Sequence, residues 1–94
     1  MKSPDQRLTE ARRQHTEAVI DRHVHELFQR LPFVCGFWLP PDLEVAELSV
    51  FSLSGGIAGW DVHDEVVQSL VDLVEERPEA LELMRGRTFA RAVH

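Results

Sequence analysis

Apolar residues recur at helical spacing over the first third of the chain. From about residue 14 they fall on one side of a helix with a period of 3.6 residues, and Pro32 interrupts the pattern. The spacing predicts a helix over about 14–31. Residues 1–13 are polar and show little periodicity, so we expect a disordered lead-in before a single domain at 14–94. The apolar stripe consists of Thr16, Val19, Ile20, His23, Val24, Leu27, Phe28 and Leu31.

After Pro32 the chain becomes rich in aromatic and β-branched residues, which are typical of strands. Two such runs, residues 33–39 and 43–53, flank Pro40-Pro41-Asp42, and neither proline can donate to a sheet ladder. The pattern therefore predicts an antiparallel β-hairpin with its turn at residues 40–42.

The apolar positions also predict how the two strands pair. If Phe37 lies opposite Val45, strict alternation fails farther along the ladder, and one extra residue at Ala46–Glu47, a β-bulge, restores it. This register turns Phe33 toward the helices and leaves both faces of the sheet apolar. Because two strands alone are marginal in water, we expect the C-terminal segment or a second copy of the chain to cover the other face. That face carries Val34, Trp38, Phe51 and Leu53.

Helical spacing returns in the second half of the chain. Residues 62–76 carry a broad apolar arc, and residues 79–85 form a shorter helix that starts beside Pro78 and ends at Gly86. Residues 88–94 fit either an edge strand or a further helical turn, and we favour the turn. The predicted fold is a small α+β domain in the order α-β-β-α-α.

The start of the second helix shows capping signals. Asp61 is the predicted N-cap, Asp64 completes a capping pair, and Trp60 is expected to pack onto the helix. The preceding segment, residues 54–59, is rich in glycine, as phosphate-binding loops are. No Lys follows it, and three carboxylates stand where a phosphate would lie, so the glycines are interpreted as a sharp connection.

Length and composition narrow the class of protein. A chain of 94 residues forms one core, and its single cysteine, Cys35, cannot form an internal disulfide or a cysteine-based zinc site. No apolar run approaches the ~20 residues that cross a bilayer. These features predict a cytoplasmic protein without membrane contact.

Charge is unevenly distributed along the chain. Residues 31–76 contain nine Asp or Glu and no Lys or Arg, which argues against a nucleic-acid interface there. The outer face of the helix at 62–76 is a ridge of carboxylates that could contact a basic protein partner or simply be solvated. Its candidate contact residues are Asp64, Glu65, Asp72 and Glu75.

Candidate catalytic and metal-binding sets are weak. Cys35 lies between apolar neighbours and lacks nearby cations, so we predict no catalytic residue and no cofactor. Glu17, Asp21 and His25 share one exposed ridge without a fourth ligand, and no metal site is predicted. A site using the histidines remains an alternative, with candidate ligands His15, Asp21, His23 and His25.

The sequence favours a non-enzymatic interaction or regulatory module. An apolar excess on the sheet predicts a homodimer, and the acidic helix offers a surface to a basic partner. The alternative is a small enzyme or ligand-binding domain. Its pocket would be lined by Cys35, Trp38, Trp60 and His63.

Overall fold

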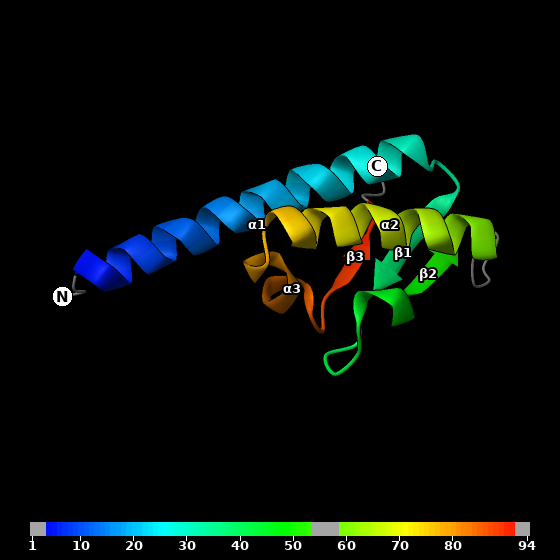
Figure 1. Cartoon of the computed structure of the whole chain (residues 1–94). Coiled ribbons are helices and arrows are strands. Elements are labelled where there is room, and N and C mark those ends of the chain that lie inside the picture. The colour runs from blue at the N-terminus through cyan, green and yellow to red at the C-terminus, as the bar shows by residue number, and fades with distance from the viewer. Residues whose placement is uncertain (1–3, 54–58, 92–94) are drawn as a thin grey trace.

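The chain folds as three α-helices, one 3₁₀-helix and a three-stranded sheet in the described residues, 4–53 and 59–91, of a computed structural model (Figure 1). The predicted α+β class is confirmed, as is the predicted order α-β-β-α-α of the α-helices and the first two strands. The elements are α1 (Pro4–Arg30), β1 (Val34–Trp38), η1 (Val45–Glu47), β2 (Ser49–Ser52), α2 (Trp60–Glu76), α3 (Glu79–Met84) and β3 (Thr88–Ala90).

The sheet has the order β2-β1-β3, with both pairs antiparallel. The predicted helical turn in residues 88–94 is therefore wrong for β3, and residues 92–94 lie outside the described residues. Phe89 lies opposite Phe37, and their rings stack with centroids 4.9 Å apart. This buried aromatic contact favours the strand over a helix. Gly36, which pairs with Ala90, allows β3 to approach β1 closely. A Cβ at residue 36 would lie 2.6 Å from the Phe89 carbonyl oxygen.

The predicted strand register is wrong. Phe37 pairs with Val50 instead of Val45, because residues 39–48 form a long connection that contains η1. The irregularity lies in β1, between Val34 and Gly36, and not at Ala46–Glu47. Val45 is buried within the 3₁₀-helix, so its apolar side chain reaches the core without joining the ladder.

The irregularity in β1 changes which side chains face the helices. Val34 and Phe37 are both buried, at 1% and 0% exposure, although three positions separate them. Val34 therefore belongs to the core, and its predicted place on the opposite face is wrong. Phe33, predicted to point inward, is 48% exposed. A strand without a bulge would have kept strict alternation, so the extra residue accounts for both errors.

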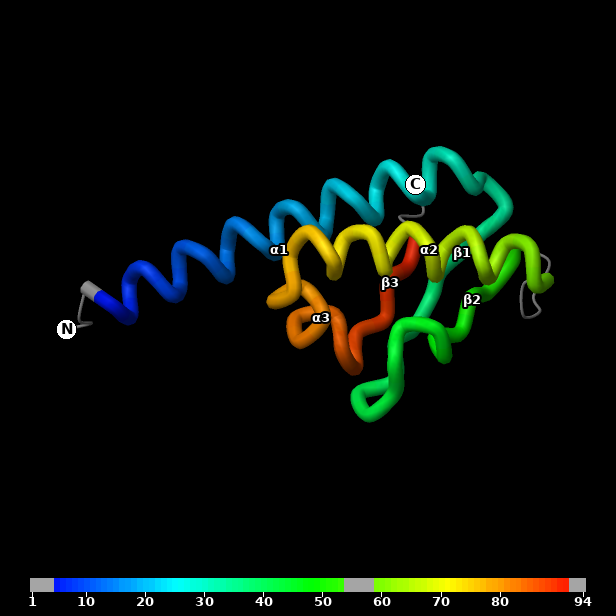
Figure 2. The backbone as a smooth tube through the Cα atoms, viewed as in Figure 1, coloured from blue at the N-terminus to red at the C-terminus, as the bar shows by residue number. Residues whose placement is uncertain are grey.

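Side chains of all three helices form one buried core with the inner face of the sheet. The buried row Phe37, Val50 and Phe89 runs across the three strands and forms one core with the helices. In Figures 1 and 2, α1 and α2 run alongside each other, with the sheet beneath α2 and α3 at one end. The helical part of the core consists of Ile20, Val24, Leu27 and Phe28 from α1, Val66, Leu70 and Leu73 from α2, and Ala80 and Met84 from α3.

α1 begins ten residues before its predicted start at about residue 14, and residues 4–13 are its first turns. Every side chain from residue 5 to residue 15 is exposed, and this segment extends beyond the rest of the domain (Figure 2). We call residues 4–15 the arm. Its Ala, Leu, Arg, Glu and Gln residues favour helix without tertiary contacts, which explains why the lack of apolar periodicity did not end the helix.

The Arg91 side chain binds the C-terminal end of α1. Its Nε donates to the Val34 carbonyl at 2.9 Å, and one terminal nitrogen donates to the carbonyls of Phe28 and Leu31 at 2.8 and 2.7 Å. The guanidinium also lies over the Phe28 ring, 5.1 Å from its centroid. A cation here satisfies carbonyls at a helix C-terminus and opposes the negative end of the helix dipole.

The ends of the later helices differ partly from the prediction. α2 begins at Trp60, one residue before the predicted cap Asp61, and its N-cap is Gly59. Trp60, which was predicted to pack onto the helix, is 81% exposed, and its ring contacts His63 in the first turn of α2. Gly86 follows α3 with a φ of 75°, the left-handed conformation expected of a glycine after a helix. The glycine-rich connection at residues 54–58 lies outside the described residues.

Candidate functional site

The outer face of the sheet carries exposed apolar side chains. Trp38 and Phe51 are each 38% exposed on this face, and Leu53, just after β2, is 61% exposed. We call these three residues the outer patch. Thr88 lies beside Trp38, and Ala90 lies in the same row as Phe51. The face is therefore apolar or weakly polar, with no charged residue in these two rows.

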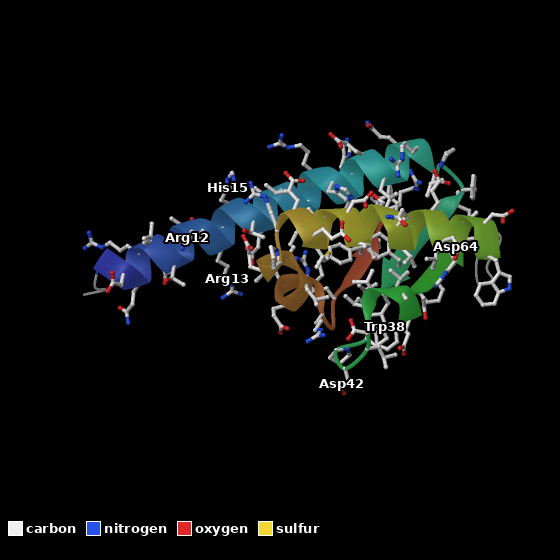
Figure 3. All side chains as sticks on the ribbon, in the orientation of Figure 1. Arg12, Arg13, His15, Trp38, Asp42 and Asp64 are labelled. Atoms are coloured by element: carbon white, nitrogen blue, oxygen red, sulfur yellow. The ribbon has the colours of Figure 1, made fainter. Side chains whose placement is uncertain are left out.

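The strand alternation explains why these residues point outward. The adjacent row, Phe37, Val50 and Phe89, is buried beneath the helices, so the rows on either side must face away from them. Figure 3 shows Trp38 on the side of the domain away from α1. Three of the four residues predicted for this face are exposed, and Val34 is the exception.

The acidic surface lies on α2. Asp64, Glu65, Asp72 and Glu75 are all exposed, because the opposite side of the helix packs into the core. Gln68 donates a hydrogen bond to the Asp72 carboxylate at 2.9 Å. Because α2 packs into the core on the inner side of the sheet, its acidic residues and the outer patch lie on different surfaces of the domain.

The four residues of the alternative pocket occupy different environments. Cys35 is half-buried in β1, whereas Trp38 faces outward and Trp60 is exposed at the start of α2. His63 donates from Nε2 to the Leu48 carbonyl at 2.9 Å, and its ring meets the Trp60 ring edge-on with centroids 6.0 Å apart. The structure thus brings Trp60 and His63 into contact.

Two surface hollows lie along α1, away from these four residues. One of about 510 Å³ separates the arm from α3, and another of about 400 Å³ lies between α1 and the end of α2. None of the four residues of the alternative pocket lines either hollow. The first is lined by Thr9, Arg12, Arg13, Glu79, Glu82 and Leu83.

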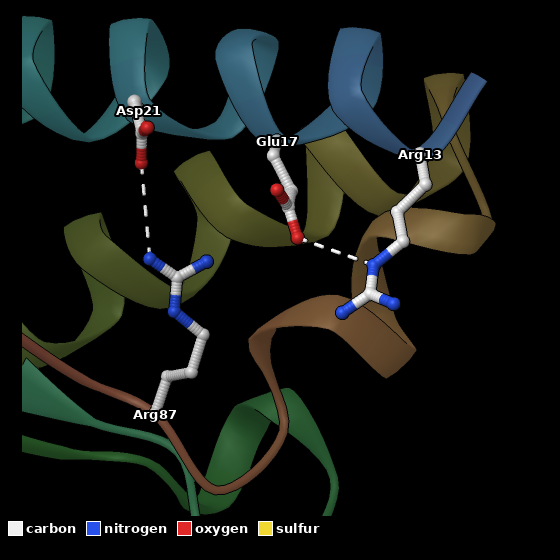
Figure 4. Close-up of polar contacts among 4 residues, drawn as sticks. All are labelled: Arg13, Glu17, Asp21 and Arg87. Atoms are coloured by element: carbon white, nitrogen blue, oxygen red, sulfur yellow. Dashed lines mark hydrogen bonds and ion pairs between the residues drawn. The ribbon is translucent and has the colours of Figure 1, made fainter. Parts of the chain in front are cut away.

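The candidate metal ligands on α1 make other contacts. Figure 4 shows Glu17 paired with Arg13 at 3.3 Å and Asp21 paired with Arg87 at 3.8 Å. His23 Nε2 lies 2.8 Å from the Ser69 hydroxyl and 3.0 Å from its carbonyl oxygen, which ties α1 to α2. Across the described ranges, no three His, Cys, Asp or Glu side chains are grouped so that they could hold a metal ion.

The two other α1 histidines are also engaged. His15 Nε2 accepts a hydrogen bond from the Arg77 guanidinium at 3.2 Å, and His25 lies 3.2 Å from the Gln29 amide. A metal would therefore have to displace contacts between helices or along the exposed face of α1. On the exposed ridge, Glu17 and Asp21 thus form ion pairs and His25 a hydrogen bond.

Two polar contacts could not be foreseen from spacing. The Thr16 hydroxyl, although buried, donates to the Glu79 carboxylate at 3.1 Å across 63 residues of sequence. A backbone hydrogen bond at Glu79 lowers the pKa of its carboxyl below the usual 4.5, and Thr16, Arg77 and Arg12 act in the same direction. The second is the clamp by Arg91, which depends on β3.

No protein-family model, curated protein or solved structure matches the chain. Among the described residues, no helix has the length and apolarity needed to cross a bilayer. A functional inference therefore rests on the chemistry of the exposed surfaces.

Proposed function

We propose that the protein is a non-enzymatic interaction module that self-associates through the outer patch. The supporting observation is the exposure of Trp38 and Phe51 on a sheet whose opposite face is closed by helices. Large aromatic side chains dominate the energy of many interfaces, because they bury much area at little cost in conformational entropy. A second copy placed against this face would remove both rings from water.

The patch is small, which sets the expected strength of association. Burial of apolar surface contributes about 25 cal/mol per Å², and three side chains on each copy supply far less than the ~800 Å² per partner of a typical stable interface. Thr88 and Ala90 extend the contact area but add few strong interactions. We therefore expect a weak, reversible dimer whose population depends on protein concentration.

The acidic side of α2 is proposed as a second surface, for a basic protein. Residues 61–76 contain six carboxylates and no cation, so the potential over this helix is uniformly negative. Such a surface steers and orients a positively charged partner, and the attraction weakens as salt shortens the Debye length. Because this surface is separate from the outer patch, a dimer could present two copies of it.

Sedimentation velocity over a range of concentrations tests self-association. The wild-type protein should shift toward dimer as concentration rises, and Trp38→Ser with Phe51→Ser should weaken this shift strongly. Trp60→Ser is the matched control, because it removes a more exposed tryptophan that lies outside the sheet. Equal association by the wild-type and the double variant would contradict the proposal.

Binding to a polylysine peptide tests the acidic surface. Affinity should fall with added salt and should fall further when Asp64, Glu65, Asp72 and Glu75 are replaced by their amides. Asp42→Asn with Glu44→Gln serves as the control, since both residues are exposed in the loop before η1. Binding that is insensitive to salt or to the amide replacements would exclude this role.

A further inference from the structure

One face of the arm continues the face of α1 that packs into the core. Asp5, Leu8, Thr9 and Arg12 recur at spacings of three and four residues in line with Thr16 and Ile20, so they share one side of the helix. Thr16 and Ile20 are buried, at 1% and 0% exposure, whereas Leu8 is 55% exposed. The same stripe is therefore covered at one end and uncovered at the other.

The stripe passes from buried to exposed at the point where the rest of the domain stops covering α1. α3 reaches Thr16 through Glu79, and beyond it lies the hollow between the arm and α3. Figure 3 shows Arg12 and Arg13 on the arm, outside the layer formed by α2 and the sheet. A helical segment of this length is marginal in water without a packing partner. A partner that continued the covered stripe would stabilise it.

We propose that the arm pairs with the arm of a second copy, antiparallel and about a two-fold axis between residues 8 and 9. The charges on the uncovered stripe are self-complementary in this arrangement: Asp5 of each copy meets Arg12 of the other. Leu8 of each copy lies against Thr9 of the other, at the centre. The occupant of the exposed face is thus another molecule of this chain.

The overlap fits the length of the arm. With residue 5 opposite residue 12, residue 4, the first described residue of the arm, lies opposite residue 13. The paired described residues therefore precede Thr16, where α3 begins to cover the helix. The pair spans about 15 Å, at the helical rise of roughly 1.5 Å per residue. Each tip then approaches the hollow that Arg12 lines together with Glu79 and Glu82. Asp5 would meet Arg12 there, since Arg13 is already paired with Glu17.

The electrostatics of the pair have a further component. Arg12 already helps to lower the pKa of its own Glu79, so it would lie between two carboxylates in the dimer. Antiparallel helices also place opposite ends of their dipoles together. Pairing of the arms is independent of the outer patch, because the arm lies at the far end of α1 from the part that packs on the core.

The test uses the full chain carrying Trp38→Ser and Phe51→Ser, so that association through the outer patch is removed. In sedimentation equilibrium this background should still dimerise weakly. Asp5→Arg or Arg12→Asp should weaken dimerisation about tenfold, because each change replaces two exposed attractions with two repulsions. The swap Asp5→Arg with Arg12→Asp should restore it, since the charges are again complementary between like copies.

Mixing and control experiments complete the test. A fluorescently labelled swap variant should not co-associate with chains that keep the original arm, because like charges would then meet at both ends of the hybrid pair. Arg7→Glu changes the opposite side of the arm and should leave dimerisation unchanged. Circular dichroism of each variant checks that α1 is retained. A background that stays monomeric at hundreds of micromolar, or a swap that fails to restore dimers, would overturn the proposal.

Discussion

The two halves of α1 show how one helix can serve different purposes. Residues 16–30 bury Ile20 and Leu27 in the core and are closed by Arg91 at the C-terminal end. Residues 4–15 have the same backbone conformation, but all of the side chains from residue 5 onward are exposed. Helical propensity favours the helix in both halves, whereas residues 16–30 are also held by packing against the core.

The sheet shows the same contrast between covered and uncovered apolar surfaces. Phe37 is fully buried on the inner face, and the next residue, Trp38, is 38% exposed on the outer face. Strand alternation forces neighbouring residues to opposite sides, so an apolar residue at both positions leaves one of them uncovered. The arm and the outer patch are thus two places where apolar side chains stay uncovered, and they are the surfaces for which we propose partners.

The largest expected effect is a difference in the free energy of unfolding between substitutions in the two halves of α1. Ile20→Ala should lower the free energy of unfolding by roughly 2–5 kcal/mol, because it leaves a cavity in the core. Leu8→Ala should change it by less than about 0.5 kcal/mol, since the side chain is exposed and alanine favours helix. Urea denaturation of both variants, at a concentration where the protein is monomeric, gives the comparison. Equal losses would mean that the arm is packed like the core.

Removal of the Arg91 clamp should have the next largest effect. Arg91→Ala leaves three partly buried carbonyls without their charged donor and should cost about 1.5–3 kcal/mol of stability, the range for hydrogen bonds to charged groups. Arg91→Lys should recover little, because an ammonium group cannot reproduce the planar fork. Arg30→Ala, at an exposed position in the last turn of α1, is the control and should be nearly neutral. A similar stability for Arg91→Ala and Arg30→Ala would show that the clamp does not hold α1 to the sheet.

The smallest expected effect concerns the pH dependence at the junction of arm and core. The pKa of Glu79 is lowered in the folded protein, so its stabilising contribution is complete above the usual value of 4.5 and is lost as pH falls through the folded pKa. The stability difference between wild-type and Glu79→Gln should therefore shrink on acidification below 4.5. Thr16→Val should raise the pKa of Glu79, which NMR titration of its carboxyl can measure. A pKa of Glu79 unchanged by Thr16→Val would contradict the contact.

The sequence predicted the parts of the fold that depend on local patterns. These local signals are the helical periodicity at Ile20 and Leu27, the interruption of that pattern at Pro32, and the glycine after α3. The corresponding elements are present in the structure. The register of β1 and β2 was wrong because alternation cannot show that Val45 enters the core from a 3₁₀-helix. The start of α1 was wrong because an exposed helix has no apolar stripe to reveal it.

Long-range contacts account for the rest. The outer patch was recognised because Trp38, Phe51 and Leu53 are apolar residues in excess of what two strands can bury. Val34 was misassigned, because the bulge between Val34 and Gly36 reverses the alternation in β1 and the apolar pattern does not reveal it. The role of Arg91 depends on β3, whose three residues carry too little pattern to distinguish strand from helix.

Amide hydrogen exchange along α1 most directly tests the division between a packed half and an arm that awaits a partner. At low protein concentration, the amides of residues 20–30 should exchange slowly and those of residues 5–15 rapidly, because only the first group must wait for the core to open. At high concentration the arm should gain protection while the packed half stays unchanged. Slow exchange of both groups at low concentration would contradict the account, since the arm would then be stable within a single chain.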